Sequence, residues 1–104
     1  MKLGVFTPLF NHLSFEEMIE EVAKKGLQTV EIGTGGYPGN AHLDIDKLLA
    51  SSDERKEYLA KLADKGLEIS ALSCHNNPIS PIPEVAAEAD TLLRKTIKLA
   101  SLLN

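Results

Sequence analysis

One segment of this chain occurs twice, at a spacing of about 40 residues, and this repeat limits the folds open to it. Residues 25–33 read KGLQTVEIG and residues 65–73 read KGLEISALS. Each copy follows a segment with helical spacing of apolar residues and continues into a polar stretch. Parallel strands cannot be joined by a tight turn and need a crossover, which is usually helical. The repeat therefore predicts an α/β fold of parallel βα repeats, with functional residues at the carboxyl ends of the strands.

The predicted elements alternate along the chain. Strands are predicted at residues 3–6, 29–32 and 67–73. The first helix is predicted with the most support, because Ser14 and Glu17 have the spacing of a capping box and Gly26 is placed to end the helix. Further helical segments are predicted at residues 44–50, at 52–65 after a break at two serines, and from 83 to the end of the chain.

Three βα units leave both outer strands of the sheet unpaired. Exposed apolar strand edges favour aggregation or pairing with another chain. A closed (β/α)8 barrel takes roughly 250 residues, whereas this chain has 104. We therefore expect residues 1–104 to form one partial domain, the first three βα units of a TIM barrel, or else a module that completes its sheet by self-association as a homo-oligomer.

Composition excludes several classes of partner. The net charge of −4 argues against a nucleic-acid partner, which would require a basic surface. No stretch approaches the roughly 20 apolar residues of a membrane span, so no membrane partner is expected. Cys74 is the single cysteine, which excludes an intrachain disulfide and favours a reducing, cytoplasmic location.

Glu31 is the candidate catalytic residue. It lies between Val30 and Ile32 in the second predicted strand, where an unpaired charge is costly unless it faces a polar cavity. In a barrel, strand residues alternate between the interior and the helix layer, so Glu31 is expected to point inward. The competing interpretation is a structural hydrogen bond across the barrel.

The candidate substrate-binding residues follow the predicted strands. They are His75, Asn76, His12, Asn11 and His42. At the carboxyl ends of parallel strands, imidazole and amide groups can contact a substrate, and imidazole can also bind a metal. The competing interpretations are a structural histidine, turn-forming asparagines and, for His42, an ordinary surface loop position.

The glycine-rich stretch from Gly33 to Gly39 allows a ligand to approach the backbone closely, or it forms a plain turn or lid. It matches neither a P-loop nor a dinucleotide-binding fingerprint. Cys74 has no base beside it except His75, which is expected on the opposite face of the strand, so a structural thiol is the better interpretation.

Three segments carry a resemblance to a known family. Residues 1–7 (MKLGVFT), 29–40 (TVEIGTGGYPGN) and 69–75 (ISALSCH) resemble the opening strands of the xylose-isomerase-like TIM barrels, which include sugar phosphate isomerases and epimerases. The resemblance spans the whole chain but only the N-terminal portion of that fold.

The resemblance implies an enzyme that moves a proton next to the carbonyl of a sugar or sugar phosphate, with a divalent metal (Mn, Mg, Co or Zn) as cofactor. It also implies that most metal ligands come from later strands, so the 104-residue chain alone is expected to be inactive. His75 matches a metal-binding histidine of the AP-endonuclease-type relatives, although substrate contact is the expectation here. A nuclease of that type is the less favoured alternative, because the chain is acidic.

Overall fold

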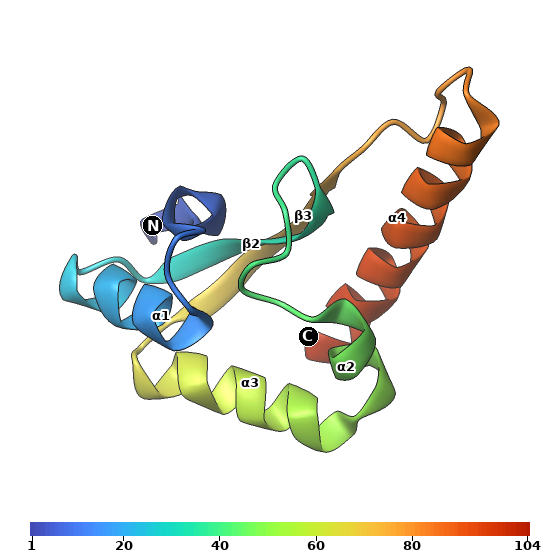
Figure 1. Ribbon diagram of the computed structural model, residues 1–104. Coiled ribbons are helices and arrows are strands. Elements are labelled where there is room, and N and C mark those ends of the chain that lie inside the picture. The colour runs from blue at the N-terminus through green and yellow to red at the C-terminus, as the bar shows by residue number, and fades with distance from the viewer.

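The three apolar segments form one parallel sheet. The structure, a computed structural model, describes residues 1–104, and its strands are β1 (Gly4–Phe6), β2 (Thr29–Gly36) and β3 (Glu68–His75). They lie in the order β1-β2-β3, with both neighbouring pairs parallel (Figure 1). The carboxyl ends of all three strands therefore lie along the same edge of the sheet. This edge is distinct from the two lateral edges, which are formed by β1 and β3.

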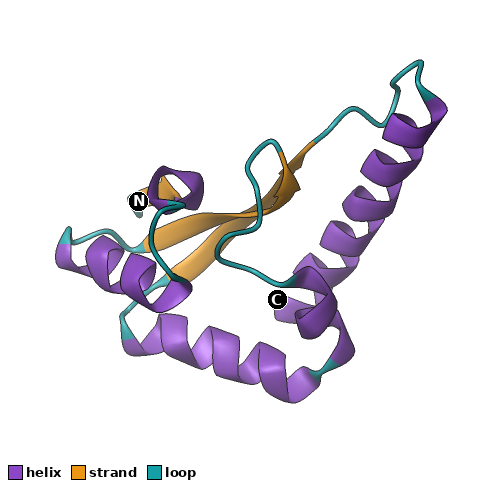
Figure 2. Cartoon of the chain, viewed as in Figure 1, coloured by secondary structure: helices purple, strands orange, loops and turns teal.

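A 3-10 helix and three α-helices connect the strands, and a fourth α-helix follows the last one. They are η1 (Thr7–Phe10), α1 (Phe15–Lys24), α2 (Ile45–Ala50), α3 (Ser52–Asp64) and α4 (Pro83–Leu103). The four α-helices gather along one side of the sheet and leave its other face open (Figure 2). We call the open face, which carries Phe6, Glu31 and Ala71 in register, the inner face.

Alternation along β2 defines the two faces. Val30 and Ile32 are fully buried against the helices, whereas Glu31 is half-buried and lies between them in sequence. The core under the helices is aliphatic, with Met18, Val22 and Leu62 among its fully buried side chains. The sequence pattern of β2 therefore corresponds to a strand covered on one side only.

The first helix has the predicted ends. The Ser14 side chain accepts from the backbone N–H of Glu17, and the Glu17 carboxylate accepts from the backbone N–H of Ser14. Gly26 follows the helix with a φ of 76°, and Gly66 follows α3 with a φ of 72°. The repeated glycines thus end two helices in the left-handed conformation that favours glycine.

The break between the second and third helices is also as predicted. The Ser51 hydroxyl accepts from the backbone N–H of Glu54 at the start of α3. Arg55 Nη1 donates to the carbonyl oxygen of Leu48 at 2.8 Å and to that of Leu49 at 3.3 Å. These contacts satisfy polar groups at a helix junction where the chain changes direction.

Two strands extend further than predicted. β2 continues through the glycines to Gly36, and β3 continues to His75, because Gly35 pairs with Cys74 and Gly36 with His75. Glycine has a low intrinsic preference for the strand conformation, but pairing of β2 with β3 overrides that preference here. The segment after β1 begins with the 3-10 turn η1.

Candidate functional site

The strand ends bring several predicted residues to one edge of the sheet. Phe6 ends β1 and His75 ends β3, and the paired position of His75 on β2 is Gly36. Parallel strands placed side by side in this way form the edge at which α/β folds bind their ligands. This edge, together with the adjacent inner face, is the candidate site.

Glu31 lies on the inner face, as the alternation predicts. Its backbone pairs with Phe6 on one side and Ala71 on the other. No lysine, arginine or histidine of this chain forms an ion pair with its carboxylate. The group therefore stays available for a ligand on the open face, although its predicted catalytic role remains a prediction.

His75 contacts an aromatic ring across the sheet. The rings of His75 and Phe6 meet edge to face, with centroids 6.5 Å apart and planes at 86°. The contact crosses β2, the strand that lies between β1 and β3. Phe6 was not among the predicted site residues, and its only signal was its place at the inward alternate position of the first strand.

The glycine-rich stretch folds back over the end of β2. The backbone N–H of Gly39 donates to the Gly36 carbonyl oxygen at 3.1 Å, and both glycines have positive φ angles, 72° and 69°. A Cβ added to Gly33 would lie 2.8 Å from Pro38 Cβ and 2.7 Å from the Gly39 carbonyl oxygen. The turn of residues 36–39 therefore covers Gly33 closely, and the two parts fit only with glycine there.

Two asparagines hold this turn from either side. Asn11 Nδ2 donates to the Pro38 carbonyl oxygen at 3.4 Å, and the Asn76 side chain occupies the space that a Cβ on Gly36 would need. The backbone N–H of Tyr37 donates to the His75 carbonyl oxygen at 3.2 Å. The loops after all three strands are therefore in contact with one another.

The other two predicted histidines, His42 and His12, lie in surroundings different from those of His75. His42 is 3% exposed, and its Nε2 lies 3.0 Å and 3.1 Å from the carbonyl oxygens of Phe10 and Leu13. Because both partners are acceptors, Nε2 must carry the proton. His42 thus ties the loop after β2 to the segment after β1, while His12 is exposed in that same segment.

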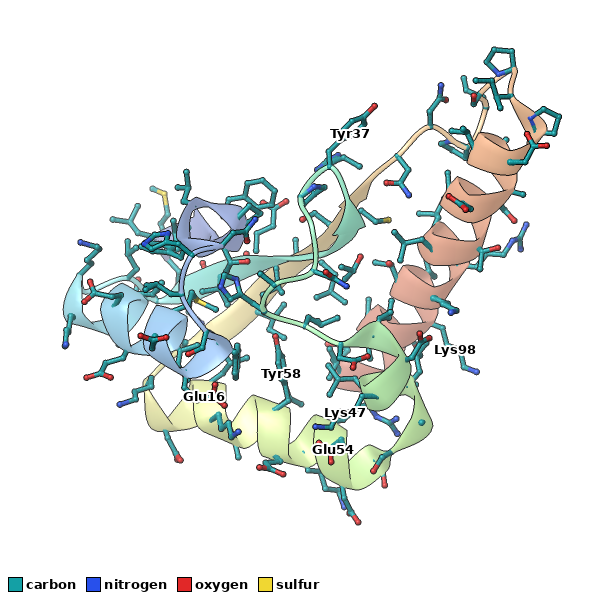
Figure 3. All side chains as sticks on the ribbon, in the orientation of Figure 1. Glu16, Tyr37, Lys47, Glu54, Tyr58 and Lys98 are labelled. Atoms are coloured by element: carbon teal, nitrogen blue, oxygen red, sulfur yellow. The ribbon has the colours of Figure 1, made fainter.

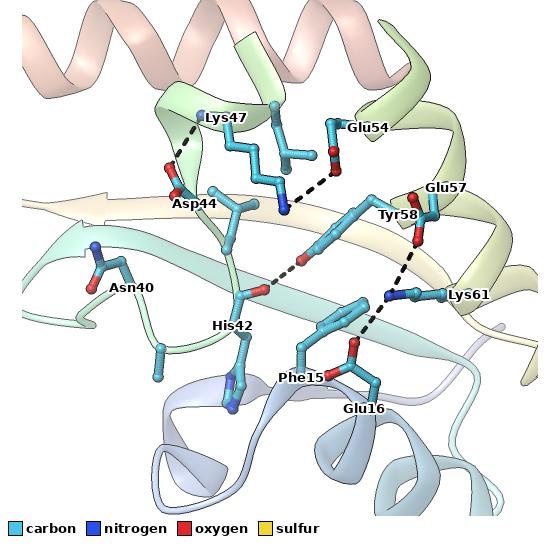
Figure 4. Close-up of a pocket in the computed structure, with 13 residues that line it drawn as sticks. Phe15, Glu16, Asn40, His42, Asp44, Lys47, Glu54, Glu57, Tyr58 and Lys61 are labelled. Carbon is cyan, nitrogen blue, oxygen red and sulfur yellow. Dashed lines mark hydrogen bonds and ion pairs between the residues drawn. The ribbon is translucent and has the colours of Figure 1, made fainter. Parts of the chain in front are cut away.

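A separate cleft of about 640 Å³ opens between α1, α2 and α3 (Figure 4). Its lysines are paired, Lys47 with Glu54 at 3.5 Å and Lys61 with Glu16 at 3.0 Å. The hydrogen bond from Lys61 lowers the pKa of the exposed Glu16 carboxyl. Because both of its lysines are paired internally, this cleft presents no free cation for a ligand, and its remaining carboxylate, Asp44, accepts from the backbone N–H of Lys47.

The floor of the same cleft is an aromatic pair. The rings of Phe15 and Tyr58 stack with centroids 4.4 Å apart, and the Tyr58 hydroxyl donates to the His42 carbonyl oxygen at 2.8 Å. Burial raises the pKa of Tyr58 well above its usual range. These contacts give Tyr58 a structural role in the helix layer.

No metal centre is formed by this chain. No three side chains of histidine, cysteine, aspartate or glutamate gather closely enough to hold an ion. His75 in particular contacts the Phe6 ring and has no carboxylate in an ion pair beside it. A metal, if one acts at this edge, would need ligands from outside the chain.

Comparison with known proteins identifies the fold. No protein-family model matches the chain. The structure is similar to D-psicose 3-epimerase from Clostridium cellulolyticum H10, solved with D-tagatose, with a TM-score of 0.55 and 23% sequence identity over 96% of this chain and 35% of that one. The chain has the fold of the N-terminal βα units of a TIM barrel.

A curated relative is likewise much longer than this chain. The chain is 40% identical over 103 residues to "Uncharacterized protein YfiH" of Bacillus subtilis (strain 168), which covers 99% of this chain and 33% of that protein. The chain therefore spans about a third of the length of each of these two proteins. None of its helices is long and apolar enough to cross a bilayer.

Proposed function

We propose that this chain is the N-terminal part of a sugar or sugar phosphate isomerase or epimerase, and that residues 1–104 are one portion of a single TIM-barrel domain. The observation that supports the proposal is the meeting of three parallel strand ends in the fold of a sugar epimerase, with Glu31 and His75 on one face. The reaction class is proton transfer next to a carbonyl.

Glu31 would be the catalytic residue of this portion. Its carboxylate faces the open side of the sheet without an internal cation, so it can accept a hydrogen bond from a substrate hydroxyl or exchange a proton with it. His75, Asn76 and Asn11 lie at the rim above it, where their imidazole and amide groups would bind further hydroxyls.

The metal and the remaining proton-transfer groups would come from outside this chain. A divalent metal in such a site polarises substrate oxygens. The residues present here do not form its ligand set. The chain alone is therefore expected to bind sugar weakly and to catalyse nothing.

A chimera tests the proposal. This chain would replace the matching third of the B. subtilis relative, and the purified chimera would be incubated with Mn²⁺ and D-tagatose, or its 6-phosphate, in D₂O. We expect deuterium to enter the carbon next to the carbonyl, as measured by NMR, and Glu31→Gln to abolish this exchange. The matched control is Glu68→Gln, at the opposite end of the sheet, which should leave exchange unchanged.

A folded chimera that exchanges no carbon-bound hydrogen on either sugar would refute the enzyme proposal. Circular dichroism and thermal unfolding would establish that it is folded. Exchange that survives Glu31→Gln would instead refute the role of Glu31 alone.

A second candidate function is a non-catalytic α/β module completed by self-association. It is favoured by an apolar groove of about 810 Å³ between α3, β3 and α4, beside the unpaired edge of β3. Leu59, Ile69 and Leu103 are among its lining residues. Light scattering after size exclusion distinguishes the two, because a stable oligomer of the chain alone would favour the module.

A further inference from the structure

Tyr37 is a large aromatic side chain held in solvent at the rim of the candidate site. It is 89% exposed, and Figure 3 shows its ring projecting from the tip of the turn between Gly36 and Gly39. No part of the proposed function accounts for it. The other tyrosine, Tyr58, is packed against Phe15 and hydrogen-bonded, as aromatic residues of a folded interior usually are.

The backbone that carries this ring is fixed on every side. The Tyr37 N–H donates to the His75 carbonyl oxygen at 3.2 Å, and the Gly39 N–H closes the turn on Gly36 at 3.1 Å. Pro38, the next residue, is buried against Gly33, and its carbonyl oxygen accepts from Asn11. The exposure of Tyr37 is therefore a property of an ordered turn and not of a loose end of the loop.

An ordered turn that presents an aromatic ring suits recognition of a ligand. Tyrosine offers a large contact area and loses little rotamer freedom on binding, and a backbone already fixed loses none. The ring belongs to the same rim as His75, to which its own backbone is bonded, and His75 in turn contacts Phe6. Tyr37, His75 and Phe6 thus lie at the carboxyl ends of three neighbouring strands, Tyr37 just after β2, His75 at the end of β3 and Phe6 at the end of β1.

The charge of this rim indicates the part of the ligand that it contacts. None of the 11 lysine and arginine residues of the chain lies in the segments that follow the strands, residues 7–14, 33–44 and 75–82. Apart from Asp44, the polar side chains of these segments are amides, imidazoles and hydroxyls. Such a surface suits the uncharged ring or chain of a sugar, whose C–H groups pack on an aromatic face while its hydroxyls bond to amides.

We propose that Tyr37 is a sugar-stacking residue, whose ring packs against the C–H face of a carbohydrate bound over His75 and Phe6. The proposal rests on the proposed function and adds a substrate-contacting residue to it. Stacking requires the aromatic ring and does not require the hydroxyl, so Tyr37→Phe should retain binding where Tyr37→Ala loses it.

The test uses the 104-residue chain labelled with ¹³C-tyrosine and titrated with D-tagatose. The two tyrosines give separate ring signals, assigned by Tyr37→Phe, and buried Tyr58 is the internal reference. We expect the Tyr37 ring signal to shift with the same apparent Kd as the backbone amide of His75. Tyr37→Ala should raise that Kd about tenfold, while Tyr37→Phe should change it less than about twofold.

Ile79 provides a matched control. It is also 89% exposed and lies in the loop after β3, but its backbone is not part of the turn that bonds to His75. Ile79→Ala should leave the Kd unchanged, which separates stacking by Tyr37 from a general effect of removing exposed apolar surface.

The outcomes separate the two proposals. If the His75 amide shifts with sugar while the Tyr37 ring does not, or if Tyr37→Ala binds with the parent Kd, the stacking proposal is wrong and the sugar site stands. If neither signal moves up to the solubility limit of the sugar, the stacking proposal is wrong for this chain, and the chimera alone decides the proposed function. A Tyr37 shift that follows protein concentration without sugar would also refute stacking, because it would place the ring in a contact between copies.

Discussion

Gly33 shows how closely single residues are fitted at the candidate site. Its φ is not in the left-handed region, so the requirement for glycine comes from space alone: Pro38 and Gly39 occupy the position of a side chain. In sequence, this glycine is indistinguishable from its neighbours in a glycine-rich loop. The structure separates it from Gly36 and Gly39, whose positive φ angles form the turn.

Gly33→Ala should displace the turn. The added methyl would lie below 3.0 Å from both Pro38 Cβ and the Gly39 carbonyl oxygen, so we expect a loss of about 1–3 kcal/mol in unfolding free energy, typical of overpacking. The backbone signals of Tyr37 and His75 should shift in ¹⁵N NMR spectra. Urea unfolding and these spectra check the two parts.

Gly26→Ala is the matched control for that substitution. Nothing lies within 4 Å of a Cβ at Gly26, but its φ of 76° makes any side chain strained. It should cost about 1–2 kcal/mol of stability without moving the Tyr37 or His75 signals. Unmoved Tyr37 signals in Gly33→Ala would contradict the packing described here.

The predicted site residues show where sequence reasoning holds and where it stops. Strand alternation is enough to place Glu31 on the face opposite Val30 and Ile32, because the period of two is a local property. The contacts of His42 are not local: its two partners lie about 30 residues earlier in the chain, and no spacing pattern reports them. Whether the predicted residues bind a sugar remains a prediction.

At the scale of elements, α4 is joined to the sheet by a buried polar contact. Thr34 Oγ1 on β2 donates to the Ser73 carbonyl oxygen on β3 at 3.2 Å and lies 2.8 Å from Thr96 Oγ1 on α4. Thr34 and Thr96 are 2% and 5% exposed. The pair fixes the position of a helix whose N-terminal part extends away from the sheet (Figure 1).

A double-mutant cycle measures this contact. Thr34→Val should destabilise the chain by about 1–3 kcal/mol, because it leaves the buried Thr96 hydroxyl without its partner and removes one donor to the Ser73 carbonyl oxygen. Thr96→Val should cost less, since Thr34 keeps its bond to Ser73. The double variant should be more stable than the sum of the two losses predicts. Strict additivity in urea unfolding would show that the hydroxyls do not interact.

The elements themselves were largely predictable from local signals. The capping box at Ser14, the helix break before Ser52 and the proline that starts α4 were each visible in sequence and were confirmed. The ends of β2 and β3 were not, because the glycines at 33–36 are held extended only by pairing with the next strand. The helix ends follow from nearby capping residues and proline, whereas the strand ends depend on pairing with a neighbouring strand.

At the scale of the whole molecule, β2 is the only strand with two partners. β1 and β3 each have one free edge. Amides that bond within a sheet exchange slowly with solvent, whereas those on a free edge exchange quickly. We expect Val30, Glu31 and Ile32 to be the most protected strand residues, and protection along β3 to alternate from one residue to the next.

Hydrogen exchange followed by NMR checks this expectation and also bears on self-association. In dilute solution the alternation should be clear, and joining the chain to the rest of the B. subtilis relative, as in the chimera, should remove it. Uniform protection along β3 that appears only as protein concentration rises would support the self-associating module. Uniform protection in dilute solution would contradict a free edge.

The bonded loops have a consequence for protein engineering. The turn after β2 is held by Asn11 on one side and by the His75 backbone and the Asn76 side chain on the other, so its shape depends on all three loops. Grafting that turn alone onto another barrel would separate it from the groups that hold it. A transplant that preserves its conformation would have to move all three loops as one cassette.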